Sequence, residues 1–311
     1  MPNPILPAWE YIPDGEPRVF GDRVYLYGSH DRAAQSDFCD YKLKVWSAPL
    51  DDLNNWVCHG HSFHTRDDRD HKSDTEGMTD RKLFAPDVIE KDGRYYLYAY
   101  IVGSKGVVGV SDKPEGPFTD HGKMFRSNEI NVQNSIDPFY IEDGGKKYLF
   151  WGSFRGIYGI ELSDDGLSVR KGAKLRQVAG TAYEGTYIHK KDGYYYFFAS
   201  IGTCCEGLKS TYTTVVGRSK KLFGPYVDKN GKKMLDNHHE ILIHKNEAFV
   251  GTGHNSEIVT DKTGNDWVFY HAVSTKNPGG RVLMLDKVDW KDGWPSVSGN
   301  SPSSESERPV L

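Results

Sequence analysis

Acidic side chains recur at the start of repeated strand units in this sequence. Asp14 lies in IPDGEP, Asp87 in FAPDVI, Asp137 in SIDPFY and Glu184 in YEGTYI, and each precedes a short apolar strand and a glycine-containing turn. A surface loop would account for one such acid, because most acidic residues lie at the surface. A random distribution of 43 acids would rarely fill four equivalent positions. The recurrence therefore predicts a functional cluster of carboxylates.

Carboxylates clustered in this way could hydrolyse a glycosidic bond. That reaction needs a protonated carboxylic acid beside the leaving oxygen and an ionised carboxylate on the other side of the sugar ring. A third carboxylate can keep the acid protonated near neutral pH, because like charges close together raise one pKa. The residues around Asp14, namely Pro13, Gly15 and Pro17, would hold that carboxylate at a fixed position.

The elements that would position these residues are aromatic-rich strands. They recur in five units: FGDRVYLYGSHD, EKDGRYYLYAYIVG, IEDGGKKYLFWGSF, HKKDGYYYFFASIG and DKTGNDWVFYHAVS. Each unit has a turn with glycine followed by a strand that alternates aromatic and small residues, which is typical of β-hairpins. A second short strand is predicted ahead of each turn, at Pro17–Phe20, Val88–Glu90, Phe139–Glu142, Thr186–His189 and Ser256–Thr260.

Five units of several strands each predict an all-β fold, a five-bladed β-propeller. In a propeller the innermost strand of each blade begins near the central axis, so one polar residue at each start would point into a shared pocket. His254, in GTGHNSE, takes this position in the fifth unit. A long β-sandwich or two small β domains are the alternatives. No shift in composition marks a boundary, so residues 1–311 are predicted to form a single catalytic domain with a polar tail from about residue 297.

The overall composition excludes several classes of protein. A net charge of −4 without a basic stripe argues against nucleic acid as a partner, and no apolar run is long enough for a membrane span. Aromatic residues make up 13% of the chain, which suits strands and the binding of sugar rings. The predicted partner is therefore an oligosaccharide substrate, and nothing in the composition predicts an oligomeric state. The N-terminus MPNPILPAWEY lacks the features of a signal peptide, so a cytoplasmic enzyme with reduced cysteines is expected.

At these residues the chain resembles glycoside hydrolase family 43. The matching motifs run from residue 3 to about 296 and are IPDGEP, APDV, SIDPF, YEGTY, TCCEG, GHN and GGRVLMLDKVDWKDGWP. The resemblance implies a five-bladed β-propeller that inverts the anomeric configuration. It implies that Asp14 is the general base that activates water, that Glu184 is the general acid, and that Asp137 orients the acid and tunes its pKa. An inverting pair stands roughly 6.5–9.5 Å apart, which leaves room for water.

The resemblance also implies roles for three other residues. His254 matches a histidine at the propeller centre and would bind an accessory calcium ion within a mostly watery shell; a core histidine is the alternative. Arg281 matches an arginine that contacts the bound sugar, and it could also form a salt bridge to an axial carboxylate. Phe84 would form an aromatic wall for the sugar or pack in the core.

Cysteines and histidines outside these motifs have weaker signals. Cys204 and the adjacent Cys205 are expected to be reduced and to line the pocket floor, because a disulfide between neighbouring residues is rare and no CxxC spacing is present. His30 and Asp31 are further candidates to face the pocket. A solvated loop is the interpretation for four histidines whose spacing fits no metal site, namely His59, His61, His64 and His71.

The resemblance narrows the substrate to arabinosides and xylosides. Arabinofuranose and xylopyranose overlap closely in space, so one pocket can serve both. The prediction is an exo-acting α-L-arabinofuranosidase, with β-xylosidase activity as a second possibility, acting on short oligosaccharides from arabinoxylan or arabinan. An endo-1,5-α-L-arabinanase with an open cleft and a non-catalytic sugar-binding propeller are the alternatives. A related five-bladed family that cleaves fructosides with retention is excluded, because its NDPN-like motif and Glu-Cys pair are missing.

Overall fold

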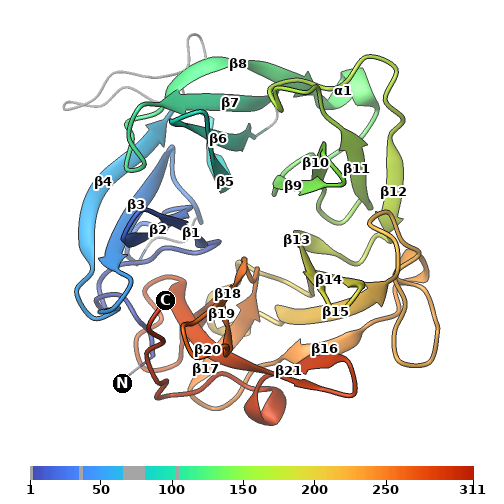
Figure 1. Cartoon of the computed structure of the whole chain (residues 1–311). Helices are drawn as coiled ribbons and strands as arrows, with labels where there is room; N and C mark the ends of the chain where they lie inside the picture. Colours follow the sequence, from blue (N-terminus) through green and yellow to red (C-terminus); the bar gives the residue numbers. More distant parts are fainter. Residues whose placement is uncertain (1–2, 35–37, 66–80, 103–104) are drawn as a thin grey trace.

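Five antiparallel sheets surround a central axis in the computed structural model of the chain (Figure 1). The structure describes residues 3–34, 38–65, 81–102 and 105–311. The first three sheets have four strands each, and a single parallel contact between Thr213 and Thr252 joins the last two. The predicted five-bladed β-propeller is therefore confirmed.

Successive strands in the sequence form each blade from the axis outward. The first blade contains β1 (Glu16–Phe20), β2 (Arg23–Gly28), β3 (Lys42–Pro49) and β4 (Val57–His64). The second contains β5 (Leu83–Lys91), β6 (Arg94–Ile101), β7 (Lys105–Ser111) and β8 (Thr119–Arg126). The third contains β9 (Phe139–Asp143), β10 (Lys146–Trp151), β11 (Ile157–Glu161) and β12 (Arg176–Ala179).

The last two blades follow the same order with one irregularity. The fourth contains β13 (Glu184–Lys191), β14 (Tyr194–Ile201), β15 (Thr213–Ser219) and β16 (Glu240–Ile243). The fifth contains β17 (Phe249–Gly253), β18 (Ile258–Thr260), β19 (Asp266–Ser274), β20 (Val282–Lys291) and β21 (Trp294–Ser296). Both β17 and β18 pair with β19, so its innermost strand is interrupted near His254. The helical segments are short: α1 (Ser127–Ile130), η1 (Gly207–Lys209), η2 (Met234–Asp236) and η3 (Ser298–Asn300).

The predicted turns join the two innermost strands of the blades. In the second and fourth blades the register leaves a two-residue loop, Asp92-Gly93 and Asp192-Gly193. All four residues have positive φ, as a type I′ turn requires. The Asp-Gly pairs therefore set the hairpins that bring the innermost strands to the axis.

The chain enters the innermost strands through a left-handed residue. Asp14, Ala85, Asp137, Gly185 and His254 have φ between 40° and 65°. In the second and fourth blades the strand register also shifts beside this residue. A bulge re-aims the neighbouring side chains, and left-handed conformations of non-glycine residues persist where the surroundings hold them. These entries turn polar side chains toward the axis.

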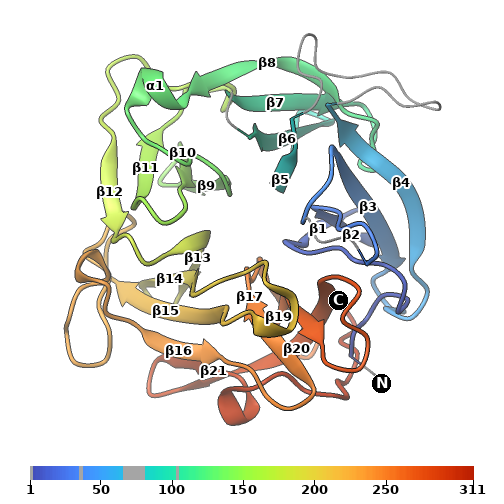
Figure 2. The ribbon, with the colours of Figure 1, turned by 180° about the vertical axis from the view of Figure 1, so that it is seen from behind.

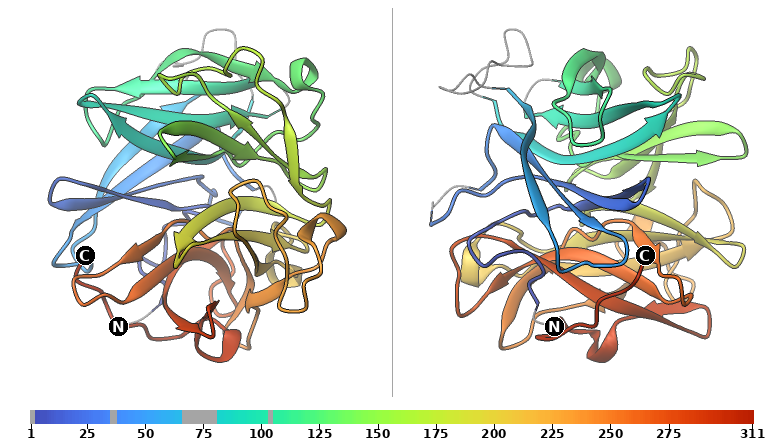
Figure 3. Two further views of the ribbon diagram at one scale, coloured as in Figure 1. Left: turned by 45° about the vertical axis from the view of Figure 1, so that its right-hand side comes forward. Right: turned by 60° about the vertical axis from the view of Figure 1, so that its left-hand side comes forward.

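The first and last blades close the ring through buried packing and hydrogen bonds rather than through a shared sheet. The amide of Asn3 brackets Leu285 of β20, with 3.0 Å from Nδ2 to the carbonyl oxygen and 3.1 Å from the backbone nitrogen to Oδ1. Ile5 and Leu6 share a hydrophobic cluster with Leu285. Figures 1 and 3 show both chain ends beside these two blades.

The tail beyond residue 297 packs against the same junction. The backbone nitrogen of Leu311 donates to the carbonyl of Leu50 at 2.8 Å, and the Leu311 side chain is buried. The rear view in Figure 2 shows this segment running beside the first and fifth blades. The tail is thus polar in composition yet anchored at its end.

Two further expectations concern segments away from the axis. His59, His61 and His64 lie in the outer strand β4, so their interpretation as a solvated loop was wrong; His71 lies outside the described residues. Across the described ranges, no helix combines the length and apolar character that crossing a bilayer requires.

Candidate active site

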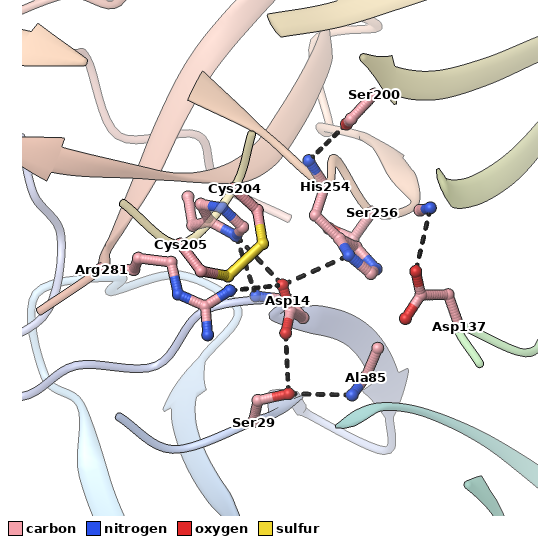
Figure 4. A network of polar contacts seen from close by, with 12 residues as sticks. Asp14, Ser29, Ala85, Asp137, Ser200, Cys204, Cys205, His254, Ser256 and Arg281 are labelled. Atoms are coloured by element: carbon pink, nitrogen blue, oxygen red, sulfur yellow. Dashed lines mark hydrogen bonds and ion pairs between the residues drawn. A yellow bond between two sulfur atoms is a disulfide. The ribbon is translucent and has the colours of Figure 1, made fainter. Parts of the chain in front are cut away.

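A cavity of about 240 Å³ opens where the innermost strands begin. Seven of the site residues predicted from the sequence line it: Asp14, Phe84, Asp137, Glu184, Cys204, His254 and Arg281. These residues come from all five blades and from the loop after β14. Figure 4 shows several of them converging around Asp14. The propeller therefore gathers segments that are far apart in the sequence into one polar pocket.

Asp14 is buried, and both of its carboxylate oxygens have partners. The Ser29 hydroxyl donates to Oδ2 at 2.8 Å. Nδ1 of His254 lies 3.2 Å from Oδ1, and Nδ1 of His271 lies 3.1 Å from it. Nη1 of Arg281 lies 3.5 Å from the same oxygen. This shell holds the carboxylate in one orientation.

The shell also keeps Asp14 ionised. Burial would raise the pKa of the carboxyl, but His254, the Arg281 guanidinium and the contact with His271 bring it well below its usual range. Burial lowers the pKa of His254 to about 4, so its ring is uncharged near neutral pH. The permanent positive charge comes from Arg281. An ionised, oriented carboxylate is what a general base requires.

The pKa values of Asp137 and Glu184 are raised, in contrast to that of Asp14. Burial and the charges of Glu184 and Asp14 raise the pKa of Asp137 well above its usual range. Burial also raises the pKa of Glu184, against hydrogen bonds from Ser153 and Tyr212. The Ser153 hydroxyl donates to Glu184 Oε2 at 2.5 Å. The two carboxyls titrate as a coupled pair, which retains a proton to higher pH than either group would in water.

Arg281 pairs with the axial carboxylate of Asp14, and a salt bridge of this kind was one of its two predicted roles. Its Nε and Nη2 lie 2.8 Å from the two carboxylate oxygens of Asp31, a bidentate pair. The guanidinium is thereby fixed beside Asp14, on the wall of the cavity. Contact with a sugar stays a prediction for Arg281. Of the two further candidates, Asp31 borders a neighbouring cavity, whereas His30 lies against Glu10 and Asp40.

Asp87 does not join the carboxylates at the cavity, contrary to the expectation that all four would share one pocket. Its Oδ1 lies 2.5 Å from Nη2 of Arg18, and its Oδ2 accepts from the backbone nitrogen of Tyr140 at 2.7 Å. Arg18 also pairs with Glu16 and Glu257. The register shift between Phe84 and Asp87 accounts for the difference, because it places Phe84, rather than Asp87, at the pocket.

Cys204 and Cys205 are linked by a disulfide, so the prediction of reduced thiols was wrong for this pair. The other two cysteines of the chain, Cys39 and Cys58, are free. Both linked residues line the cavity, as expected for the pocket floor. Phe84 lines it too, and its ring centroid lies 5.7 Å from that of Phe38. Phe84 therefore stands at the wall.

Several residues of the site had not been singled out from the sequence. Ser29, Ser153 and Ser200 each lie at or just after the end of the second strand of a blade, in YGSHD, WGSF and FASIG. Each bonds to the entry of the next inner strand in the ring. Ser29 bonds to Ala85 N at 2.8 Å and Ser200 to His254 N at 2.7 Å (Figure 4). Ser153 bonds to the Glu184 side chain. The recurrence of serine at the ends of the units was the available signal.

The residues present fit a metal ion only in a limited way. Across the part of the chain that the structure describes, no three His, Cys, Asp or Glu side chains are grouped as metal ligands. Nε2 of His271 is buried without a hydrogen-bond partner, and His254 faces the cavity. One imidazole nitrogen with water would suit a weakly held, mainly water-liganded ion.

A propeller with an ionised carboxylate facing a proton-retaining carboxyl pair is the arrangement of a glycoside hydrolase. Comparison with known proteins identifies the family of glycoside hydrolases: the family model of glycosyl hydrolases family 43 matches residues 1–295. The chain belongs to this family and is a glycoside hydrolase.

Individual relatives include both modes of attack. The extracellular endo-α-(1→5)-L-arabinanase 1 of Bacillus subtilis (strain 168) is 35% identical over 68% of this chain and 68% of its own length. The extracellular exo-α-(1→5)-L-arabinofuranosidase ArbA of Cellvibrio japonicus (strain Ueda107) is 34% identical over 70% of each. Among solved structures, the α-L-arabinanase of Cellvibrio cellulosa complexed with arabinohexaose superimposes with a TM-score of 0.77 at 28% identity, covering 93% of this chain and 96% of that one.

Proposed function

We propose that this chain is an exo-acting, inverting glycoside hydrolase that releases terminal α-L-arabinofuranosyl residues from short oligosaccharides, with β-D-xylosyl residues as a second substrate. The observation that carries the proposal is the contrast in protonation within one cavity: Asp14 is held ionised, whereas the pair of Asp137 and Glu184 retains a proton. A binding protein would have no need of this contrast.

The reaction follows from these states. A water molecule near Asp14 gives a proton to the carboxylate while its oxygen bonds to the anomeric carbon. The bond from that carbon to the leaving oxygen breaks, and Glu184 donates its proton to this oxygen. Asp137 shares the proton of the pair with Glu184, because burial and the negative charge of Glu184 raise the pKa of Asp137, and it accepts from the Gly185 backbone at 3.1 Å. Attack from the side opposite the leaving group inverts the anomeric configuration.

Exo action is supported by the size of the cavity. At about 240 Å³ it lies below the roughly 300–1,000 Å³ of pockets for drug-sized ligands, and a single sugar ring suits it better than a chain. The exo-acting relative from Cellvibrio japonicus supports the same choice. Endo action is the second candidate, because a neighbouring cavity of about 370 Å³ could continue the site, and the Bacillus subtilis relative is named as an endo-arabinanase.

An accessory calcium ion is part of the proposal. His254 or the unpartnered Nε2 of His271 would contribute one ligand and water the others, and the ion would add positive charge near Asp14. Calorimetric titration of the chelator-treated protein with CaCl₂ tests this site, and the His271→Gln variant identifies its ligand.

The Cys204–Cys205 disulfide argues against the predicted cytoplasmic location. A disulfide is uncommon in the reducing cytoplasm and persists in oxidising compartments. The Cys204–Cys205 bond therefore favours an oxidising compartment over the original prediction. Thiol trapping in intact cells, followed by mass spectrometry of this loop, distinguishes the two locations.

The test of the function compares 4-nitrophenyl α-L-arabinofuranoside, 4-nitrophenyl β-D-xyloside and linear arabinan as substrates of the wild type and of Glu184→Ala. We expect the wild type to turn over the arabinofuranoside and to release arabinose as the sole early product from arabinan, and we expect the variant to lose its activity on arabinan. A ladder of oligosaccharides would establish endo action instead. No turnover of any substrate would refute the proposal. Proton NMR of the first product should show the inverted anomer.

A further inference from the structure

The Cys204–Cys205 disulfide lies at the border of two cavities. One is the cavity that contains Asp14 and Glu184, and the other is the neighbouring cavity of about 370 Å³. Four residues line both cavities: Phe38, Cys204, Cys205 and Arg281. The disulfide is thus part of the surface that a ligand extending from one cavity into the other would touch.

The bond determines which way these two side chains face. In an extended chain, neighbouring side chains point to opposite sides. Linking the two sulfurs holds them side by side, so both reach the two cavities instead of one turning away. The linked sulfurs form a polarizable surface without the S–H donors of free thiols. Such a surface suits the C–H face of a sugar ring through close packing.

The base of the loop is held independently of the disulfide. Thr203 N donates to Thr211 Oγ1 at 3.0 Å, and Thr211 N donates to Thr203 Oγ1 at 3.2 Å. Tyr212 N donates to the Thr203 carbonyl at 3.1 Å. Opening the disulfide would therefore change the surface at the cavities while leaving the ends of β14 and β15 in place.

From this position we infer that the Cys204–Cys205 disulfide is a specificity-determining wall: the sugar residue bound beside Asp14 packs on it, and the next sugar residue lies in the neighbouring cavity. The inference rests on the proposed function and deepens it. Phe38 is the aromatic part of the same boundary, with the Arg281 guanidinium carbon 5.9 Å from its ring centroid. The wall contacts substrate but exchanges no proton with it, so it affects binding rather than the chemical step.

The experiment measures steady-state kinetics on 4-nitrophenyl α-L-arabinofuranoside and on arabinotriose, before and after treatment with dithiothreitol. Two electrons and two protons pass from the dithiol to the disulfide, which gives two protein thiols and the cyclic disulfide of the reagent. Thiol titration of the denatured protein should rise from two free cysteines to four. We expect KM to rise about tenfold, the scale of a lost apolar contact, with kcat changed by less than about twofold.

Two variants complete the design. Cys204→Ser/Cys205→Ser should have the raised KM in both buffers. Cys58→Ser, which removes an exposed free cysteine of β4, should respond to dithiothreitol as the wild type does. If the double variant does not fold, the reduced wild type carries the test alone, with circular dichroism as the check that it remains folded.

The outcomes separate this inference from the proposed function. If thiol titration finds four thiols but KM is unchanged, the inferred role of the disulfide in binding is wrong. A fall in kcat at constant KM after reduction would also contradict it. If the oxidised wild type hydrolyses none of the substrates, the proposed function fails and the inference fails with it. Activity without any response to reduction overturns the inference alone.

Discussion

Asp14 and Glu184 are both buried carboxyls that face one cavity, yet their pKa values move in opposite directions. Burial raises the pKa of each, so the direction is decided by neighbours. Asp14 has the cationic Arg281 and two histidines beside it. Glu184 has two hydroxyl donors, Ser153 and Tyr212, and the Arg281 charge lowers its pKa less than these donors do, so burial prevails. The individual neighbours of each carboxyl therefore determine which one acts as the base and which one as the acid.

Replacing Glu184 by Gln should remove the proton donor while preserving the shape of the site. We expect kcat/KM on arabinotriose to fall by about 10²–10⁴-fold, the usual contribution of general acid catalysis. The loss on 4-nitrophenyl α-L-arabinofuranoside should be much smaller, because nitrophenolate leaves without a proton. Initial rates on both substrates measure this difference, with the exposed Glu247→Gln as control. Equal losses on the two substrates would argue against the acid role.

Replacing Asp137 by Asn should shift the alkaline limb of the pH profile. In the wild type the coupled pair loses its last proton at raised pH, because the final ionisation places two negative charges together. Asparagine removes one charge, so the pKa of Glu184 falls and kcat/KM declines from a lower pH. The acid limb should move less. The measurement is kcat/KM against pH for both proteins, and an alkaline limb that stays in place would contradict the coupling.

At the scale of elements, each blade stabilises the catalytic entry of its neighbour. A serine at the end of the second strand reaches the left-handed entry of the next inner strand in three places, through Ser29, Ser153 and Ser200. His271 of β19 does the same between the last blade and the first, with Nδ1 3.4 Å from the Asp14 nitrogen. The hydrogen bonds to the backbone nitrogens of Ala85, His254 and Asp14 hold conformations that would otherwise be strained.

Replacing Ser29 by Ala tests this link. It leaves the buried Ala85 N–H without its acceptor and removes a donor to Asp14. The free energy of unfolding should fall by about 1–3 kcal/mol, the cost of an unsatisfied buried group. Urea denaturation measures the loss, and the exposed Ser298→Ala is the matched control. If the two variants are equally stable, the hydrogen bonds of Ser29 do not contribute to the stability of the protein.

At the scale of the whole molecule, the ring depends on contacts between the two ends of the chain. Asn3 and Leu285 are separated by 282 positions and joined by two hydrogen bonds. Leu311 packs into the cluster that also contains Ile5 and Leu6. Because Asp14 lies between the N-terminal segment and β1, and His271 and Arg281 lie in the last blade, closure also assembles the shell of Asp14.

Replacing Asn3 by Ala should weaken closure. Both the backbone nitrogen and the carbonyl of Leu285 lose their partner in a buried place, so we expect a loss of about 1–3 kcal/mol in the free energy of unfolding. The exposed Asn54→Ala should leave stability nearly unchanged. Urea denaturation again measures the effect; an unchanged midpoint for Asn3→Ala would show that apolar packing alone closes the ring.

The sequence by itself determined the repeat, the hairpins and the identity of the residues at the cavity. Asp-Gly turns and alternating strands are local signals, and their recurrence five times predicts blades whose inner strands begin at one axis. Asp14, Asp137, Glu184 and His254 could be found because each occupies the same place in its unit.

Only the tertiary structure decided where the side chains at equivalent places of the repeat units point and which residues they contact. The register shift in β5 directs Asp87 to Arg18 and brings Phe84 to the pocket. The pKa directions depend on Arg281 and His271, which approach Asp14 from more than 250 positions away. The Cys204–Cys205 bond depends on the conformation of one loop, since adjacency in sequence does not bring two sulfurs together. Such features arise from long-range contacts and local backbone geometry, and repeated patterns carry no information about either.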